Sequence, residues 1–396
     1  MKRTVLSLLF FLVAGSVTLV SLALAQDATP LTQPLHAYYT YGKLSGVTTE
    51  EVMRGSAVAT TIPMGPYTVT ASRDSNQYSG VLVGRSPFFH GNRTTNIPTF
   101  IVPVKINMPD GGVFDPGVAD SSCLSSNVPT TVTQNSPIFQ SASFTMNGKS
   151  VGTTQYIDAF QRAEFWQNVS VTGNRYHVML SPITTLAEQT FNVPVNEGGT
   201  FSIMGGCGHL GIMDISTWDS FVQGTLVPFV AAHGGGTTAF PLFLLYNVVM
   251  AEPFVPGTAD NCCILGYHNA FLPGGNVQTY GVGDFESVAA FAGTSDVSAI
   301  SHEVGEWMND PIGNNPTPGW TGGQVTTSQC NFEVGDPLSG TLFPTVTLNS
   351  FNYHVQELAF FSWFYGHPSI GTGTSDFSDN DTAPFTMDAG AVLSCP

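Results

Sequence analysis

The basic residues of this chain are confined to its first half, which leaves the second half strongly acidic. All eleven Lys and Arg residues lie at or before Arg175, whereas the segment from Tyr176 to Pro396 contains eleven Asp and eight Glu. The second segment therefore carries a charge of about -19 and has no Lys or Arg of its own to balance it. Two explanations stay open together: adaptation to acidic or harsh surroundings, and balancing of some carboxylates by bound cations.

The net charge of -17 also limits the partners of this chain. Contacts to phosphate groups need Arg or Lys, so nucleic acids, nucleotides and anionic membranes are poor partners. We expect no nucleic-acid partner.

The first 25 residues have the layout of a secretory signal peptide. A short basic start, Lys2-Arg3, precedes an apolar run from Val5 to Leu24, and Ala23-Leu24-Ala25 is a small-residue cleavage site. The apolar run is long enough for an uncleaved membrane anchor, but small and polar residues interrupt it. We therefore expect a cleaved signal, no membrane contact afterwards, and a secreted, extracellular or periplasmic protein.

Six cysteines in an exported chain suggest up to three disulfides, with fifteen possible connectivities. They are Cys123, Cys207, Cys262, Cys263, Cys330 and Cys395. The sequence contains no C-x-x-C pair, so a cysteine zinc site or a redox motif is not expected. The adjacent Cys262 and Cys263 are expected to pair with different partners.

Two regions follow the predicted signal peptide (1–25). Residues 26–195 look β-rich, with strands expected at 99–107, 141–146 and 176–180 and a helix at 154–166. Residues 196–396 alternate helices and strands. Helices are expected at 214–229, 296–309 and 353–365, strands at 263–271 and 278–285, and either a strand or a core helix at 240–250. The predicted fold class is α+β, with the β-rich region as an accessory or propeptide-like domain.

The segment 296–309 is the helix that carries candidate chemistry. Ser295 or Asp296 is its expected cap, and Pro311 is its expected stop. One face is apolar through Val297, Ile300, Val304, Trp307 and Met308. His302 and Glu306 lie nearly opposite, one turn apart, and Glu303 projects beside them. A solvated helix face would usually pair Glu with Lys or Arg, and this one has neither.

An imidazole and a carboxylate at i and i+4 can share one metal ion. A carboxylate directly after the first ligand, here Glu303, can take the proton of a metal-activated water. His302-Glu303-Val304-Gly305-Glu306 resembles the H-E-x-x-H signature of the zincin metallopeptidases, with Glu306 in place of the second histidine. The resemblance implies a zincin-like half, with a mixed sheet and an active-site helix, that binds Zn²⁺ and acts on peptide or protein substrates. Segments Ser301 to Trp307 and Phe332 to Leu338 also resemble an uncharacterised group of exported microbial proteins.

The third metal ligand is expected downstream of the helix. In the gluzincin subgroup of zincins, the third metal ligand is a glutamate that lies a few tens of residues downstream of the helix. Glu333, 27 residues after Glu306, resembles that pattern. Asp336 is the alternative. Asp310 lies about 12 Å along the axis from His302, so we expect it in an outer shell. By the same resemblance Tyr353 and His354 are expected to donate to the reaction's oxyanion, with His268 a weaker candidate.

A second cation site and a second function also stay open. Asp376, Asp379, Asn380 and Asp381 cluster in the tail and can bind Ca²⁺, although their spacing equally suits a solvated loop. The leading function is a secreted zinc metallopeptidase with His302, Glu306 and Glu333 on the metal and Glu303 as general base. The alternative is a degraded zincin-like scaffold that serves as an extracellular binding protein. Metal-dependent hydrolysis of a non-peptide bond is a third possibility.

Overall fold

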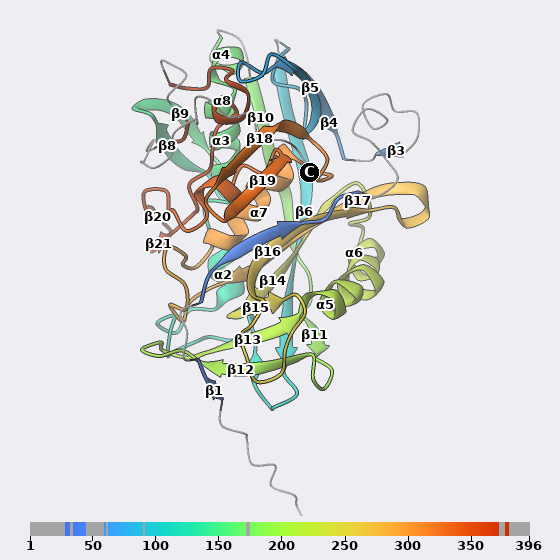
Figure 1. Cartoon of the computed structure of the whole chain (residues 1–396), viewed down its shortest axis with the longest axis vertical. Coiled ribbons are helices and arrows are strands. Elements are labelled where there is room, and N and C mark those ends of the chain that lie inside the picture. The colour runs from blue at the N-terminus through green and yellow to red at the C-terminus, as the bar shows by residue number, and fades with distance from the viewer. Residues whose placement is uncertain are drawn as a thin grey trace, which may run out of the picture.

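A computed structural model of the chain describes residues 28–31, 35–44, 59–60, 62–89, 92–171, 175–371 and 377–379. The predicted signal peptide and most of the tail lie outside these residues. The described part combines α and β structure, with one large mixed sheet and few helices (Figure 1). The prediction of a mixed sheet is therefore confirmed.

Thirteen described strands form the large sheet. Its main path runs β1 (Thr29–Pro30), β12 (Gly198–Ser202), β13 (His209–Asp214), β15 (Val248–Ala251), β16 (Cys262–Phe271), β17 (Asn276–Phe285), β14 (Phe240–Tyr246), β6 (Asn92–Asn107) and β10 (Arg175–Thr185). Off this path, β2 (Tyr38–Tyr41) pairs with β16, β3 (Ala59–Thr60) with β17, and β7 (Val113–Phe114) and β11 (Gln189–Asn192) with β6. Strands from both sides of the predicted boundary at residue 195 thus share one sheet.

Four two-stranded sheets and a small set of helices complete the described fold. The hairpins are β4 (Met64–Thr70) with β5 (Gln77–Val83), β8 (Ala142–Met146) with β9 (Lys149–Thr154), β18 (Pro316–Gly322) with β19 (Val325–Asn331), and β20 (Val346–Leu348) with β21 (Phe351–Tyr353). The α-helices are α2 (Pro129–Gln134), α3 (Tyr156–Glu164), α4 (Trp166–Val169), α5 (Ile215–Phe221), α6 (Val227–Ala232), α7 (Ser298–Asn309) and α8 (Phe361–Tyr365). The π-helix η1 (Val222–Leu226) joins α5 to α6, and η2 (Pro273–Gly275) and η3 (Asp336–Leu338) are 3-10 turns.

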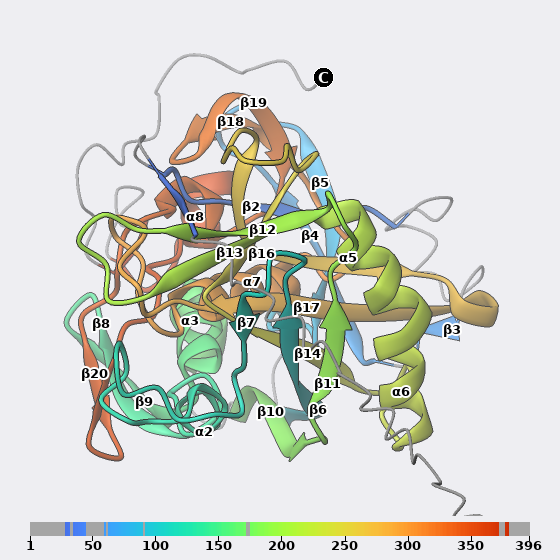
Figure 2. The same ribbon diagram turned by 90° about the horizontal axis from the view of Figure 1, so that it is seen from below.

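Both faces of the sheet are covered, because alternate residues of its strands point into two different cores. On β14, Leu242 and Leu244 belong to the core that holds α3 and α7. Phe243 and Leu245 belong to the core against α5, η1 and α6. Figure 2 shows α5 and α6 on one side of the molecule and α3 and α8 on the other. A continuous apolar segment such as 240–250 is therefore strand, β14 followed by β15, and not a core helix.

Most of the expected elements are present with shifted ends. The strands predicted at 99–107, 263–271 and 278–285 are β6, β16 and β17. Asp214 caps α5 as expected, accepting a hydrogen bond from the Thr217 amide at 3.0 Å. The helix predicted at 353–365 is wrong for its first part, because Tyr353 ends the hairpin strand β21 and only α8 is helical. The turn between β20 and β21 is at Asn349 and Ser350, both in the left-handed region.

The disulfides correct one expectation. Cys123 pairs with Cys207 across 84 residues, whereas Cys262 and Cys263 pair with each other and not with separate partners. Their shared peptide bond is cis, which brings the two Cα atoms to 3.0 Å. Cys330 is also disulfide-bonded.

Helix α7 is buried along its whole length, so its polar face is not solvated. It starts at Ser298 after Val297, and no side chain caps it, contrary to the expected Ser295 or Asp296 cap. Asp296 instead bridges to Glu286 through backbone hydrogen bonds. The helix ends at Asn309, ahead of Pro311 as predicted.

The apolar face of α7 holds it against the sheet. The Trp307 ring stacks on Phe240 of β14 at 3.8 Å, and its indole N–H donates to Thr279 Oγ1 of β17 at 2.9 Å. Gly283 lets β17 approach α7 closely, because a Cβ at this position would lie 2.8 Å from Ile300 Cγ1. These contacts fix the rotation of α7 about its axis and with it the direction in which His302 and Glu306 point.

No helix among the described residues is long and apolar enough to cross a membrane.

Removing the Trp307 side chain should destabilise the protein strongly. We expect Trp307→Ala to lower the free energy of unfolding by about 3–5 kcal/mol, because it leaves a large cavity and an unpaired Thr279 hydroxyl. Met204→Ala, at a residue 88% exposed, is the control and should stay within about 0.5 kcal/mol of wild type. Urea unfolding measures both, and equal effects of the two substitutions would contradict the packing described above.

Candidate metal site

The polar face of α7 lies in a cluster of buried imidazoles and carboxylates. Helix α7 supplies His302, Glu303 and Glu306, and β16 supplies His268. The segment after β19 supplies Glu333 and Asp336, the latter at the start of η3. All six residues are buried, and none is more than 2% exposed. Three separate parts of the second half thus bring their metal-ligating groups to one place.

The first group of possible ligands contains His302, Glu306 and Asp336, whose donor atoms all lie within 4.8 Å of one another. His302 Nε2 lies 3.1 Å from Glu306 Oε1 and 3.6 Å from Asp336 Oδ1. Two ligands of a tetrahedral ion with bonds of about 2.0–2.1 Å are about 3.3 Å apart, so these separations suit a shared ion.

The second group contains His268, Glu306 and Glu333, again with all donor atoms within 4.8 Å. His268 Nε2 lies 3.1 Å from Glu333 Oε2 and 3.9 Å from Glu306 Oε2. The structure therefore brings together the predicted ligands His302, Glu306 and Glu333, but it pairs Glu333 with His268 and pairs His302 with Asp336. Glu306 belongs to both groups.

Several atoms of the cluster are buried without a hydrogen bond to any described residue. They are His302 Nδ1 and Nε2, both oxygens of Glu303, Glu306 Oε2, Glu333 Oε1 and His268 Nδ1. The short contacts of His302 Nε2 therefore lack hydrogen-bond geometry. Buried polar atoms in native proteins nearly always have a partner, so their concentration here indicates a missing one. A divalent cation satisfies such nitrogen and carboxylate donors, and the residues present fit one.

Two glycines allow the cluster to close. A Cβ on Gly335 would lie 2.4 Å from His302 Nδ1, and one on Gly266 would lie 2.9 Å from Glu303 Oε1. Gly335 also donates its amide to Glu306 Oε1 at 3.1 Å, as does Asp336. The backbone after Glu333 thus packs on the His302 imidazole and orients the Glu306 carboxylate.

Burial controls the protonation of the cluster. It raises the pKa of Glu303 and Glu333 well above the usual range, and neighbouring carboxylates raise the pKa of Glu333 further. Burial lowers the pKa of His268 to about 4, so this imidazole is neutral at pH 7, the form that ligates metal. For His302, burial alone would lower the pKa, but the charge of Glu306 and then the contact with Asp336 outweigh it and raise it.

Strand β2, from the N-terminal region, covers the cluster. It pairs in parallel with β16, Tyr41 opposite His268 and Tyr38 opposite Ile264. The Tyr39 ring stacks on the His302 ring with their centroids 3.6 Å apart. The Tyr41 ring is stacked on that of His268 with a centroid distance of 6.0 Å. Alternate residues of a strand share a face, so both tyrosines point to the cluster.

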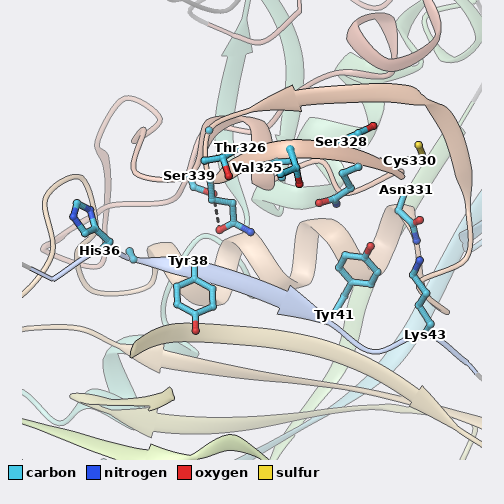
Figure 3. Close-up of a pocket in the computed structure, with 15 residues that line it drawn as sticks. His36, Tyr38, Tyr41, Lys43, Val325, Thr326, Ser328, Cys330, Asn331 and Ser339 are labelled. Atoms are coloured by element: carbon cyan, nitrogen blue, oxygen red, sulfur yellow. Dashed lines mark hydrogen bonds between the residues drawn. The ribbon is translucent and has the colours of Figure 1, made fainter. Parts of the chain in front are cut away.

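A pocket of about 870 Å³ lies between β2 and the β18–β19 hairpin (Figure 3). Tyr41 and Lys43 line one side of it, and Ser328 and Asn331 line the other. Gln324 and Gln329 also line it and donate to the two oxygens of Asp336 at 2.5 and 3.1 Å. The pocket is thus separated from the cluster by single side chains.

Gln324 also ties β2 to this pocket wall. Its side chain accepts a hydrogen bond from the Tyr39 amide at 2.7 Å and donates one to the Tyr39 carbonyl at 2.9 Å. One glutamine thus connects the covering strand with the ligand Asp336.

The other predicted site residues lie outside the two ligand groups. Asp310 accepts hydrogen bonds from the amides of Asn314 and Asn315 beyond α7, and burial raises its pKa to about 7. The Tyr353 hydroxyl donates to the Val132 carbonyl. His354 Nδ1 lies 2.6 Å from Asp296 Oδ2, ahead of α7. Tyr353 and His354, expected as oxyanion donors, therefore both contact residues outside the two ligand groups.

The predicted calcium cluster lies mostly outside the described residues. Asp376, Asn380 and Asp381 are not described, and Asp379 accepts a hydrogen bond from the Asn147 amide at 2.8 Å.

Sequence reasoning missed the contribution of the N-terminal region to this site. Tyr39, Tyr41 and Lys43 of this region are close to the cluster, and none was a candidate; nor was Gln324 in the turn between β18 and β19. The available signal was the tyrosine-rich run Tyr38-Tyr39-Thr40-Tyr41, which is typical of a strand and places Tyr39 and Tyr41 on one face of it. His268 and Asp336, predicted as weaker candidates, belong to the two ligand groups.

Comparisons of this chain with protein-family models, with curated proteins and with solved structures find no match.

A side chain at position 335 should displace His302. We expect Gly335→Ala to weaken divalent-cation binding at least about tenfold, because the added methyl group occupies the space of the imidazole. The control is Gly236→Ala, where a Cβ meets nothing within 4 Å. Isothermal titration of metal-free protein with Zn²⁺ compares the two, and unchanged affinity in Gly335→Ala would argue against the described packing.

The pair His354–Asp296 should make stability depend on pH. The hydrogen bond to Asp296 raises the pKa of His354, so its contribution is complete below the unfolded value of about 6.5 and is lost as the pH rises through the folded-state pKa. The difference in unfolding free energy between wild type and His354→Gln should therefore be larger at pH 5.5 than at pH 9. The same comparison in an Asp296→Asn background should lose this pH dependence; a difference independent of pH in both backgrounds would refute the assignment.

Proposed function

We propose that this chain is a secreted zinc metallopeptidase whose metal site is the buried cluster on α7. The observation that carries the proposal is the convergence of unpartnered, buried imidazole and carboxylate atoms from α7, β16 and the segment 333–336. The i, i+4 spacing of His302 and Glu306, with Glu303 between them, supports a zincin-like assignment. The α+β arrangement of a mixed sheet and a buried helix agrees with it.

Within this proposal each ligand has an assigned task. His302, Glu306 and the carboxylates after β19 hold the ion, and backbone N–H groups of Gly335 and Asp336 orient Glu306. A zinc ion there would act as a Lewis acid and bring the pKa of a water molecule to about 7.

Glu303 is the proposed general base. Both its oxygens lack a hydrogen bond among the described residues, and its charge interacts with those of His302 and Glu306. It accepts a proton from the attacking water at a carboxylate oxygen and passes that proton to the leaving amine. Water thereby adds to the peptide carbonyl, the C–N bond breaks, and a carboxylic acid and an amine are released.

Tyr39 takes the role of oxyanion donor that the sequence suggested for Tyr353 and His354. Its hydroxyl is buried with no hydrogen bond to a described residue, and its ring stacks on His302. Burial and then the charge of Glu303 raise its pKa well above 10, so it remains a neutral donor.

The substrate reaches this site from the pocket between β2 and the β18–β19 hairpin. The pocket has both polar and apolar lining residues, and its wall at Gln324 and Gln329 touches Asp336. A peptide segment in an extended conformation can bind in such a pocket, because the pocket lies between strands. Because the cluster is buried, Gln324 and Gln329, which separate it from the pocket, must move aside for the substrate carbonyl to reach it, while β2 and Tyr39 stay in place.

One observation favours a second candidate function. All the ligands are buried beneath Tyr39 and Tyr41, as they are at structural metal sites, which are closed. In that case the chain is an extracellular binding protein with a zincin-like scaffold, and the metal only stabilises it.

Substitution of the proposed base separates these candidates. We expect Glu303→Gln to lower peptide hydrolysis by about 10²–10⁴-fold while the metal content stays unchanged, because Glu303 moves a proton and is not a ligand. The matched control is Glu164→Gln, since Glu164 is equally buried but lies outside both ligand groups.

Hydrolysis is measured with a peptide library at neutral and acidic pH, and zinc by elemental analysis. Full activity in Glu303→Gln would overturn the assigned mechanism. Stoichiometric zinc without hydrolysis in wild type would favour the binding protein.

A further inference from the structure

We propose that the site holds two divalent cations, bridged by the carboxylate of Glu306. This inference rests on the proposed function, since it needs the cluster to bind metal, and it adds a second ion and a new role for His268.

The two oxygens of Glu306 face different partners. Oε1 lies 3.1 Å from His302 Nε2, and Oε2 lies 3.9 Å from His268 Nε2. Oε1 is held by the amides of Gly335 and Asp336, so the carboxylate cannot rotate freely. Oε2 has no hydrogen bond among the described residues. A carboxylate fixed with one oxygen toward each of two imidazoles has the geometry of a bridge.

A single ion does not account for all the donors. His302, Glu306 and Asp336 form one compact group, and His268, Glu306 and Glu333 form another. The five residues together are not one group with every donor pair within 4.8 Å. Ligands on opposite sides of one zinc ion lie at most about 4.4 Å apart, given bonds of about 2.0–2.2 Å. An ion in the first group would leave Glu333 Oε1 buried and unpartnered.

The balance of charge also favours two ions. Five buried carboxylates surround the cluster, namely Glu303, Glu306, Asp310, Glu333 and Asp336. The positive charge of Lys43 interacts electrostatically with Asp310. With all five groups ionised, one divalent ion leaves three negative charges on them, whereas two ions leave one, which Lys43 can offset. Uncompensated buried charge is costly, so the second ion removes a real penalty.

Each proposed site offers one imidazole and two carboxylates. This mixed nitrogen and oxygen set suits first-row divalent ions such as Zn²⁺ and Mn²⁺. Two ions about 3.5–4 Å apart can stabilise both the attacking and the leaving atom of a hydrolysis, which agrees with the reaction proposed above.

Counting bound ions tests the bridge. Metal-free protein is titrated with Zn²⁺ alone, and bound metal is counted by elemental analysis after desalting. Wild type and Glu164→Gln should bind two equivalents. Asp336→Asn and Glu333→Gln should each keep one tight equivalent and bind the other at least about 100-fold more weakly, because each removes a ligand from a different group.

Spectroscopy of the Mn²⁺ protein gives an independent readout that does not need the variants to fold. Two bridged Mn²⁺ ions should show a spin-coupled electron paramagnetic resonance signal, whereas an isolated ion gives six lines. One equivalent in wild type with a six-line spectrum would overturn the bridge and leave the one-metal proposal intact. Zero equivalents would overturn both.

Discussion

The burial of five carboxylates at and beside the polar face of α7 is the constraint on which the rest of this structure depends. They lie in a half of the chain that has no Lys or Arg of its own, and Lys43, from the N-terminal region, acts on one of them. Burial raises the pKa of each group for which a shift is resolved, so protonation relieves part of the cost. A bound cation relieves it at neutral pH without protons. The polar face of α7 is stable as an interior surface only under one of these conditions.

The surrounding fold holds α7 in place and covers its polar face. Trp307 and Ile300 hold α7 against the sheet, and glycines at 266 and 335 let two other backbone segments close on its polar face. Strand β2 then covers the cluster with two tyrosines and is tied by Gln324 to Asp336. The N-terminal region thus supplies the cover of the site and one of its basic residues, which is a closer involvement than an accessory domain implies.

Local pattern predicted the parts of the site that lie within one element. The helix, its apolar stripe and the neighbouring positions of His302 and Glu306 follow from a period of 3.6 residues, and the structure contains them. The pairing of Glu333 with His268, and of His302 with Asp336, depends on how two loops and a strand meet, which spacing does not encode. The parallel pairing of β2 with β16 joins residues more than 200 positions apart, so no sequence period reports it. The contact of His354 with Asp296, a residue expected as a helix cap, joins positions 58 apart, and no local pattern reports it.

Thermal unfolding with and without metal tests the central claim that cations hold these carboxylates together. The protein is stripped with a chelator at pH 7.5, dialysed, and melted before and after addition of Zn²⁺. The account predicts that stripping lowers the Tm by several degrees and that metal restores it, since binding at 1,000 times Kd is worth about 4 kcal/mol. A Tm that responds neither to the chelator nor to added metal would contradict it.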